Sequence, residues 1–372
     1  MTALVLGSVG LMLLAQTGRE PATGGGRRAS PQPHQERKLT MSDTHKVHAV
    51  GRTTVKTYQP TVFDEVPGAP TLSDIHLTET FSGDIEGEGV TVQYGPAGVQ
   101  WCTDEMLRRI GEASAASGRR VHMHLLETRY QRIWADKTFP QGIVRYLDEI
   151  GLVNERVSFA HCVHLRPDEM ELIAARGATI VINTSSNFIV SSGLAPVGEM
   201  LARGCRIAMG LDGLAFDEDE DALREMRLAY AVHKARGFDI RLPRTDLLRF
   251  AFEHGRFAVT GSIDGGRIAA GAPADLLLLD WEALSDELVE PDVPPLHLLL
   301  AKATQKHVKG LFVRGREVVR DGALATLDLA ALEAELLAVL RRAAPSTADI
   351  RAAMPALSAA LATHYGGAFY CG

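Results

Sequence analysis

The chain has 372 residues, of which 46% are hydrophobic, so it can bury a sizeable core. At roughly 100 to 200 residues per domain, it has room for two or three domains. Its formal net charge is −7, and no cluster of basic residues interleaved with aromatics offsets this charge. This balance argues against partners such as nucleic acid or an anionic membrane and favours a small molecule.

The cysteines indicate a reducing compartment. Cys102, Cys162, Cys205 and Cys371 are far apart and form no Cys-x-x-Cys pair, which argues against a disulfide framework or a zinc ribbon. We therefore expect a cytoplasmic protein.

Residues 1–40 are expected to precede the folded part of the chain. The apolar run at 3–15 has no basic residue before it and is too short to cross a bilayer. Residues 17–38 are rich in Gly, Pro, Arg and Gln, which is typical of a disordered leader, with Met41 opening the first segment that is expected to fold. An export signal is the alternative that stays open.

Residues 41–89 contain short β-branched runs separated by turn residues, which predict an antiparallel β segment. The stretch at 80–89 (TFSGDIEGEG) resembles the opening of a small bacterial β-barrel family of unknown function. Near residue 90 the pattern changes to alternating strands and helices.

Residues 90–255 predict five consecutive βα units. The first pairs a strand at 90–94 with a helix that starts at Asp104, is capped by Thr103 and ends at Gly118. The later strands are expected at 121–126, 157–160, 178–183 and 205–211, and the later helices near 142–150, at 167–176, from Pro196 and at 221–235. No glycine-rich phosphate fingerprint follows any of these strands, which argues against a dinucleotide-binding sheet. The pattern favours an α/β fold that is the latter part of a (β/α)8 TIM-type barrel.

The rest of the chain is expected to form two further parts. Residues 256–326 predict a small flanking β domain with strands at 266–268 and 274–280 and a hairpin whose turn is Arg314-Gly315. Residues 327–372 are rich in Ala and Leu with helical periodicity, which predicts two packing helices over 327–362.

Polar residues of a metal site follow three of the predicted strands. His122, His124 and Glu127 end the second strand or follow it, His161 ends the third, and Asp212 follows the fifth. Parallel α/β folds place their chemistry at such strand ends. Because imidazole and carboxylate groups bind divalent metals, these positions predict a hydrolytic metal site.

The ordered set of motifs resembles one family. The set comprises Tyr94-Gly-Pro-Ala-Gly, His122-Met-His-Leu-Leu-Glu127-Thr, Ala160-His-Cys-Val-His164, Ser186-Asn187 with Ser192-Gly-Leu-Ala-Pro196, and Gly210-Leu-Asp-Gly213. It resembles the amidohydrolase superfamily, in the branch of cytosine-deaminase-like and chlorohydrolase-like enzymes, over residues 90–322. The segments Ala274-Asp275 and Arg314-Gly315 resemble the family's flanking β-sandwich.

This resemblance implies a role for each candidate residue. It implies that His124 and Asp212 bind a divalent metal, most simply zinc with iron as the alternative. Glu127 is implied as the acid/base, His161 as the group that polarises substrate or metal-bound water, and Asp212 also as a proton acceptor. The implied reaction is hydrolysis of a C–N or C–Cl bond of a heteroaromatic small molecule, as in a deaminase.

The chain departs from the family at its first barrel strand, which in the family ends in His-x-His and supplies two metal ligands. Here the only His-x-His is His122-Met-His124 on a later strand. His122 faces the same side as His124 and is weighed as a second ligand against a structural residue, whereas His45, His48 and His76 are interpreted as surface residues. With two ligands instead of the three of a catalytic zinc site, activity is left open.

Two alternatives to a hydrolase therefore remain open. The chain could be a non-catalytic β-barrel binding or structural protein that carries an amidohydrolase relic, or a fusion without selected function. A partial barrel would leave strand edges unpaired, and a homo-oligomer would cover them.

Several other polar residues are given structural interpretations. His164, His233 and His254 have no catalytic context and are expected to be structural. Ser186 and Asn187 either lie near the site or shape a loop. The acidic run at 217–221 is interpreted as the solvated start of a helix.

Overall fold

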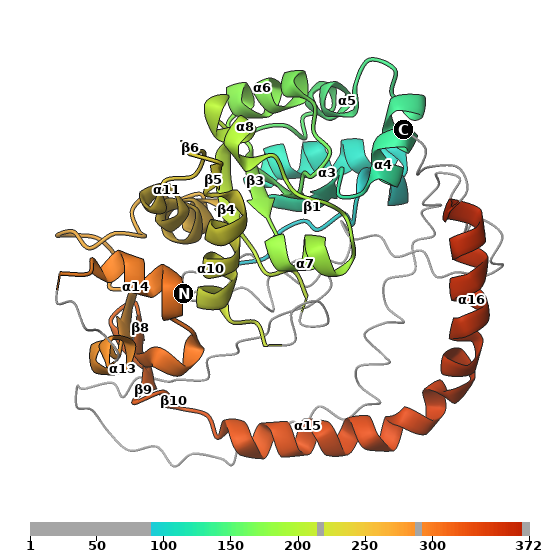
Figure 1. Cartoon of the computed structure of the whole chain (residues 1–372). Helices are drawn as coiled ribbons and strands as arrows, with labels where there is room; N and C mark the ends of the chain where they lie inside the picture. The colour runs from blue at the N-terminus through green and yellow to red at the C-terminus, as the bar shows by residue number, and fades with distance from the viewer. Residues whose placement is uncertain (1–90, 214–218, 287–291, 367–372) are drawn as a thin grey trace, which may run out of the picture.

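The computed structural model describes residues 91–213, 219–286 and 292–366 (Figure 1). The expectations for residues 1–40 and 41–89, including those for His45, His48 and His76, lie outside the described residues. The centre of the described fold is a four-stranded parallel sheet in the order β1-β2-β3-β4. Its strands are β1 (Val121–Leu125), β2 (Val157–His161), β3 (Thr179–Ile182) and β4 (Arg206–Met209). The α/β class is confirmed, with four of the five predicted parallel strands formed.

The predicted strand at 90–94 is reduced to two parallel bridges beside β1. Tyr94 pairs with Val121 and Gly98 pairs with His124. Pro96 lies between the two bridges and has no N–H to donate, so a continuous ladder cannot form there. The segment nevertheless follows the edge of β1, since the His124 N–H donates to the carbonyl of Ala97.

The helices that were predicted to follow the strands are present. They are α3 (Asp104–Ser117), α5 (Ile143–Glu149), α6 (Pro167–Arg176), α8 (Val197–Ala202) and α10 (Ala222–His233). The Thr103 side chain accepts the Met106 N–H at the start of α3, and Gly118 ends the helix at φ +73°. Met106, Leu107 and Ile110 are buried with the strands in one hydrophobic core.

Two further helices follow β1 and β3 directly and were not predicted. The helix α4 (Arg129–Thr138) buries only Ala135, so its sequence has no apolar period to detect. The helix α7 (Thr184–Ile189) has six residues, and its four buried residues are polar. Both helices begin within four residues of a strand end, and both therefore border the candidate site.

A continuous helical segment packs against the outer strand of the parallel sheet. It comprises α11 (Arg244–Arg249), the π-helical turn η2 (Phe250–His254) and α12 (Gly255–Thr260), and it follows a short hairpin of β5 (Ala235–Arg236) and β6 (Asp239–Ile240). His254 Nδ1 lies 2.7 Å from the Ile207 carbonyl of β4 and donates to it. None of these elements is predicted from the sequence.

The second sheet is antiparallel, in the order β10-β9-β8-β7, with β7 (Leu276–Leu279), β8 (Val308–Val313), β9 (Arg316–Arg320) and β10 (Ala323–Leu324). The predicted hairpin is confirmed, because Arg314 and Gly315 turn at φ +50° and +78°. The strand expected at 266–268 is wrong. Gly266 adopts φ +83°, and a Cβ there would lie 2.7 Å from the Glu253 nitrogen, so the chain bends sharply against η2 instead of extending.

The helices α13 (Trp281–Ser285) and α14 (Pro295–Lys302) and the 3-10 turn η3 (Gln305–His307) connect β7 to β8. After β10 the chain forms α15 (Leu329–Ala343), the turn η4 (Ala344–Thr347) and α16 (Ala348–Gly366), and Figure 1 shows both helices leading away from the two sheets. Two helices were predicted here, but their packing was not borne out, since α15 buries no residue. Among the described helices, none is both long and apolar enough to cross a membrane.

Candidate metal and active site

The candidate residues lie at the carboxyl ends of β1, β2 and β4. Glu127 follows β1, His161 ends β2, and Asp212 follows β4. His161 and Asp212 adopt left-handed backbone conformations at φ +69° and +68°, and Leu126 before Glu127 does so at +50°. Such a conformation costs a residue other than glycine about 1–2 kcal/mol. Strain of this kind concentrates at functional sites, and here it coincides with the three strand ends.

His124 is held by its backbone neighbours and by two aromatic rings. Its Nδ1 donates to the carbonyl of Ala97, which fixes the ring orientation and directs Nε2 away from that carbonyl. Its ring stacks on that of His161 at a centroid distance of 5.2 Å and an interplanar angle of 14°. The Trp101 ring meets His124 edge-on at 6.0 Å and is 44% exposed.

His161 is buried and holds one nitrogen without a hydrogen-bond partner among the described residues. Its Nδ1 donates to Asn187 Oδ1 at 2.8 Å, and its Nε2 is the unpartnered atom. Nε2 lies 3.9 Å from Glu127 Oε2 and 3.8 Å from Asp212 Oδ2, which is too long for hydrogen bonds. Burial lowers the pKa of His161, although Glu127, Asn187 and Asp212 oppose this effect. The ring therefore presents a neutral Nε2 lone pair toward the two carboxylates.

Both carboxylates are fixed by serine hydroxyls. Ser192 Oγ donates to Glu127 Oε1 at 3.2 Å, and Ser186 Oγ donates to Asp212 Oδ2 at 2.6 Å. The side chains of Glu127 and Asp212 are 16% and 9% exposed. They are thus partly desolvated, and each keeps oxygen lone pairs for a further ligand.

These groups fit a metal ion. One nitrogen or oxygen atom from each of His124, Glu127 and His161 lies within 4.8 Å of the others. Asp212 is not part of this group, although it is the second carboxylate beside His161. The Nδ1 protons of both histidines are donated to protein oxygens, the arrangement by which proteins orient metal-binding imidazoles. The buried, unpartnered Nε2 of His161 is an atom that a metal or a substrate would satisfy.

The helix α7 and the loop that follows it supply the groups that orient the site. Ser186, Asn187 and Ser192 contact Asp212, His161 and Glu127 respectively. From the sequence, Ser186 and Asn187 fit either a role near the site or loop shaping, and Ser192 is recognisable only as part of a motif. A signal was available, because the uncharged polar run 183–187 directly follows a fully buried strand.

The start of α7 is anchored by α10. The buried Glu225 accepts the backbone N–H groups of Thr184 and Ser185 through Oε1, at 2.8 and 3.1 Å. A carboxylate at a helix N-terminus is favoured by the peptide dipoles. Glu225 is the one acidic residue within α10, but nothing in the sequence pattern shows that it reaches another helix, so this contact was missed.

Four other histidines in the described part of the chain have protein partners. His122 Nδ1 lies 2.8 Å from Ser158 Oγ, and burial lowers the pKa of His122 to about 3. His122 is not in the group formed by His124, Glu127 and His161. His164 contacts the Ser192 carbonyl, His233 contacts Thr184 Oγ1, and His254 contacts the Ile207 carbonyl.

The acidic run before α10 is described only in part. Residues 217 and 218 lie outside the described residues. Asp221 caps α10 by accepting the N–H groups of Leu223 and Arg224. Asp221 therefore lies at a helix start as expected, but the expectation that it is solvated is wrong, because it is 3% exposed and its Oδ2 accepts the Gln305 N–H.

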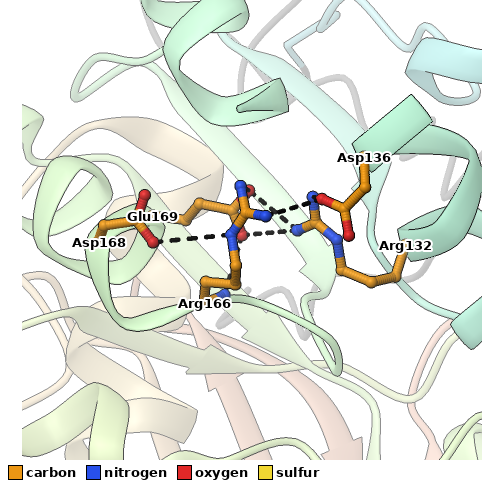
Figure 2. A network of polar contacts seen from close by, with 5 residues as sticks. All are labelled: Arg132, Asp136, Arg166, Asp168 and Glu169. Atoms are coloured by element: carbon orange, nitrogen blue, oxygen red, sulfur yellow. Dashed lines mark hydrogen bonds and ion pairs between the residues drawn. The ribbon is translucent and has the colours of Figure 1, made fainter. Parts of the chain in front are cut away.

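An ion-pair network ties α4 to α6 (Figure 2). Arg132 Nη1 donates to both oxygens of the buried Glu169, at 2.9 and 2.8 Å, and Arg132 also pairs with Asp136. Arg166 joins the network by donating to Asp136 at 2.8 Å and by pairing with Asp168 at 3.7 Å. Because α4 starts two residues after Glu127, the network fixes the segment that carries this carboxylate.

Comparison with known sequences identifies relatives. The sequence profile of the amidohydrolase family matches residues 60–318, which begins inside the segment 41–89 that we expected to be unrelated. A 5-methylthioadenosine/S-adenosylhomocysteine deaminase from Pelotomaculum thermopropionicum is 32% identical over 266 residues, covering 70% of this chain and 59% of the relative. A 5'-deoxyadenosine deaminase from Methanopyrus kandleri is 33% identical over 235 residues, covering 63% and 54%. The chain thus spans less than two thirds of the length of these relatives.

Solved structures agree with the sequence comparison. An adenosine deaminase from Xanthomonas campestris with bound zinc superposes with a TM-score of 0.67 at 27% identity, covering 75% of this chain and 64% of that one. An atrazine chlorohydrolase from Arthrobacter aurescens, complexed with zinc, gives a TM-score of 0.62 at 24% identity, covering 72% and 58%. The latter likeness supports the fold alone.

Proposed function

The chain belongs to the amidohydrolase family, and from this premise we propose that it is a metal-dependent deaminase of a heteroaromatic amine. The observation that carries the proposal is the meeting of His124, Glu127 and His161 at the ends of β1 and β2, with Asp212 of the β4 end beside them. We further propose that the parallel sheet is part of a (β/α)8-type barrel. Zinc is the proposed metal, with iron as the alternative, because the adenosine deaminase structure to which this chain is similar carries zinc.

His124 and Asp212 are the proposed metal ligands. The oxygens of Glu127 and the Nε2 of His161 complete the polar lining of the same space. A bound zinc ion supplies Lewis acidity, which makes a water molecule a stronger nucleophile near neutral pH. Every other step of the proposed mechanism falls to side chains of this chain.

The proposed reaction exchanges a ring amino group for a carbonyl oxygen. Water attacks the ring carbon that bears the amino group, and Asp212 accepts a proton from that water. Glu127 carries a proton to the adjacent ring nitrogen as the new C–O bond forms. The C–N bond then breaks as Asp212 passes its proton to the leaving nitrogen, which departs as ammonia, and the added hydroxyl group returns a proton to Glu127 as the carbonyl forms.

His161 is proposed to orient and polarise the attacked group. Its Nε2 faces both carboxylates, while Asn187 fixes its tautomer by accepting the Nδ1 proton. Ser192 and Ser186 hold the carboxylates in place during proton transfer. The left-handed backbone at His161 and Asp212 keeps these side chains at the strand ends.

The relatives suggest the substrate class. Their names give 5'-deoxyadenosine, 5-methylthioadenosine, S-adenosylhomocysteine and adenosine as substrates, all of which are 6-aminopurine nucleosides. We propose an aminopurine nucleoside for this chain. We also propose a cytoplasmic location, which the buried thiols of Cys162 and Cys205 support.

The test is ammonia release by the full chain, purified with zinc, from 5'-deoxyadenosine and 5'-methylthioadenosine. We expect turnover that is lost in Glu127→Gln, because the amide keeps the shape of the side chain and cannot carry the proton. A Glu171→Gln variant, on an exposed position of α6, is the matched control and should keep full activity.

A second result separates this proposal from the non-catalytic alternative. Nucleoside binding by zinc-loaded protein, without ammonia release and with equal affinity in Glu127→Gln, would support a binding protein that retains an amidohydrolase site. Ammonia release by the parent chain but not by Glu127→Gln would exclude the non-catalytic alternative.

A further inference from the structure

The helix α15 carries a large apolar surface that the described fold does not use. It has 15 residues and buries none of them. Leu336 is 57% exposed and Leu340 is 54% exposed. Figure 1 shows α15 and α16 lying away from both sheets. An exposed surface of this kind marks an interaction site in soluble proteins.

Five apolar side chains of α15 follow the spacing of a helix-pairing seam, and Leu337 and Leu340 widen the apolar surface beside it. The seam residues recur at intervals of three and four, and they are Leu329, Leu332, Leu336, Val339 and Ala343. This is the spacing of a and d positions in a heptad repeat. At 1.5 Å per residue the seam is about 22 Å long. Its complement is another amphipathic helix of similar length.

Charges beside the seam indicate which helix that is. In the same heptads Glu335 and Arg342 both occupy g positions, one heptad apart. Neither side chain forms an ion pair within the part of the chain that the structure describes. In an antiparallel pair, g positions of one helix face g positions of the other. Glu335 of one copy then faces Arg342 of the second copy, and the twofold axis creates the same contact again.

A parallel pair would not use these charges. In that arrangement a g position faces the following e position of the partner helix, and here that residue is Leu340. The acidic residues of α15 lie in its N-terminal two thirds and the basic residues at its C-terminal end, so antiparallel alignment is the one that matches opposite charges.

We propose that α15 pairs antiparallel with α15 of a second copy of this chain, forming a symmetric homodimer. The helix α16 extends the interface, because Ile350, Met354, Leu357 and Leu361 form a second exposed apolar stripe at intervals of four, three and four. The pairing does not depend on the proposed enzymatic function. A helix-pair interface is smaller than the standard protein interface, so dissociation on the order of micromolar is expected.

The test is a charge-swap cycle measured by analytical ultracentrifugation of the full chain across a concentration series. Glu335→Arg alone and Arg342→Glu alone each turn two attractive contacts into repulsive ones. We expect each to weaken dimerisation on the order of tenfold. The double variant Glu335→Arg/Arg342→Glu restores both pairs and should return to within about threefold of the parent.

Glu333→Arg is the matched control, because it makes the same charge change at an e position that lies on the other flank of the seam and faces apolar residues. It should weaken dimerisation less than either single swap. All four variants should keep the parent's melting temperature at low protein concentration, because the changed side chains are exposed. A monomer at 100-fold above the expected dissociation constant, or a double variant as weak as the single swaps, would overturn the proposal.

Discussion

Replacing Glu225 tests whether α10 positions the loop that orients the site. The Glu225 carboxylate accepts two backbone N–H groups at the start of α7, and Glu225 is 1% exposed. Glu225→Ala would leave the N–H groups of Thr184 and Ser185 buried without this acceptor. We expect the variant to lose both stability and activity, since the same helix carries Ser186 and Asn187.

The size of the effect follows from the two bonds. A hydrogen bond to a charged group contributes about 1.5–3 kcal/mol, so two such bonds to one oxygen put the loss near 3 kcal/mol or above. Glu225→Gln keeps an acceptor oxygen and loses the charge, so its loss should be about half as large. The catalytic rate should fall by about 10- to 100-fold in Glu225→Ala, in the range of residues that orient metal-site ligands.

The assay is urea unfolding followed by circular dichroism, with kcat/KM from ammonia release on the same preparations. Glu171→Ala on the exposed face of α6 is the control and should change stability by no more than about 0.5 kcal/mol. A Glu225→Ala variant as stable and as active as this control would refute the view that α10 fixes α7.

Three further changes test other parts of the account. Asn187→Ala should reduce zinc affinity or kcat/KM by about 10- to 100-fold, because the His161 tautomer is no longer fixed. Competition with a chelator measures the zinc affinity. If zinc affinity and kcat/KM were both unchanged, the assigned contact would be contradicted. Burial lowers the pKa of His233 from 6.5 to about 4, so the unfolded state binds the proton more strongly and stability is lost as pH falls from 6.5 toward 4. Between pH 6.5 and 5 the loss in the free energy of unfolding is about 2 kcal/mol. His233→Gln should remove this contribution from the pH dependence measured by urea unfolding. If the free energy of unfolding of parent and variant changed with pH in parallel, this prediction would be contradicted. Trp101→Ala should raise the KM for a purine nucleoside roughly three- to tenfold, because the exposed Trp101 ring lies edge-on to His124. Trp101→Phe keeps an aromatic ring and should raise the KM less. Equal KM values in the parent and Trp101→Ala would show that the ring does not contact substrate.

The predictable part of the fold is the part with a clear apolar period. The strands β1 to β4 are buried runs bounded by turns, and α3 and α6 have caps and apolar faces that the sequence displays. The helix α4 was missed because only Ala135 is buried on it, so it is held by the charged contacts of Arg132 with Glu169 and Asp136 and not by an apolar face. Periodicity does not detect such a helix.

Other elements depend on contacts that are distant in sequence. The segment around Gly266 bends because it lies against η2, and local β propensity at Ile268 does not report this. The helices α15 and α16 were predicted correctly as helices, but their amphipathic pattern was interpreted as packing within one chain. The structure leaves those faces exposed, and the sequence pattern is the same whether a helix packs on its own chain or on another.

The candidate site was predictable where strand position alone decides it. His124, Glu127, His161 and Asp212 each follow or end a buried parallel strand, and carboxyl ends of such strands meet at one edge of a sheet. The supporting residues were not predictable, because Ser192 reaches Glu127 from 65 positions away and Glu225 reaches Thr184 from 41. The first contact forms only when the loop after α7 folds over the end of β1, and the second only when α7 and α10 are brought together.

The central claim is that the ends of β1, β2 and β4 form a working metal site. Metal content per chain, measured by mass spectrometry on protein purified without chelator, tests this claim most directly. His124→Ala and Asp212→Ala are prepared alongside, with His122→Gln as a buried histidine outside the proposed ligand set. We expect about one equivalent of zinc or iron in the parent and in His122→Gln, and its loss in the other two variants. A parent protein without metal after growth in zinc, or equal metal content in all four proteins, would contradict the account.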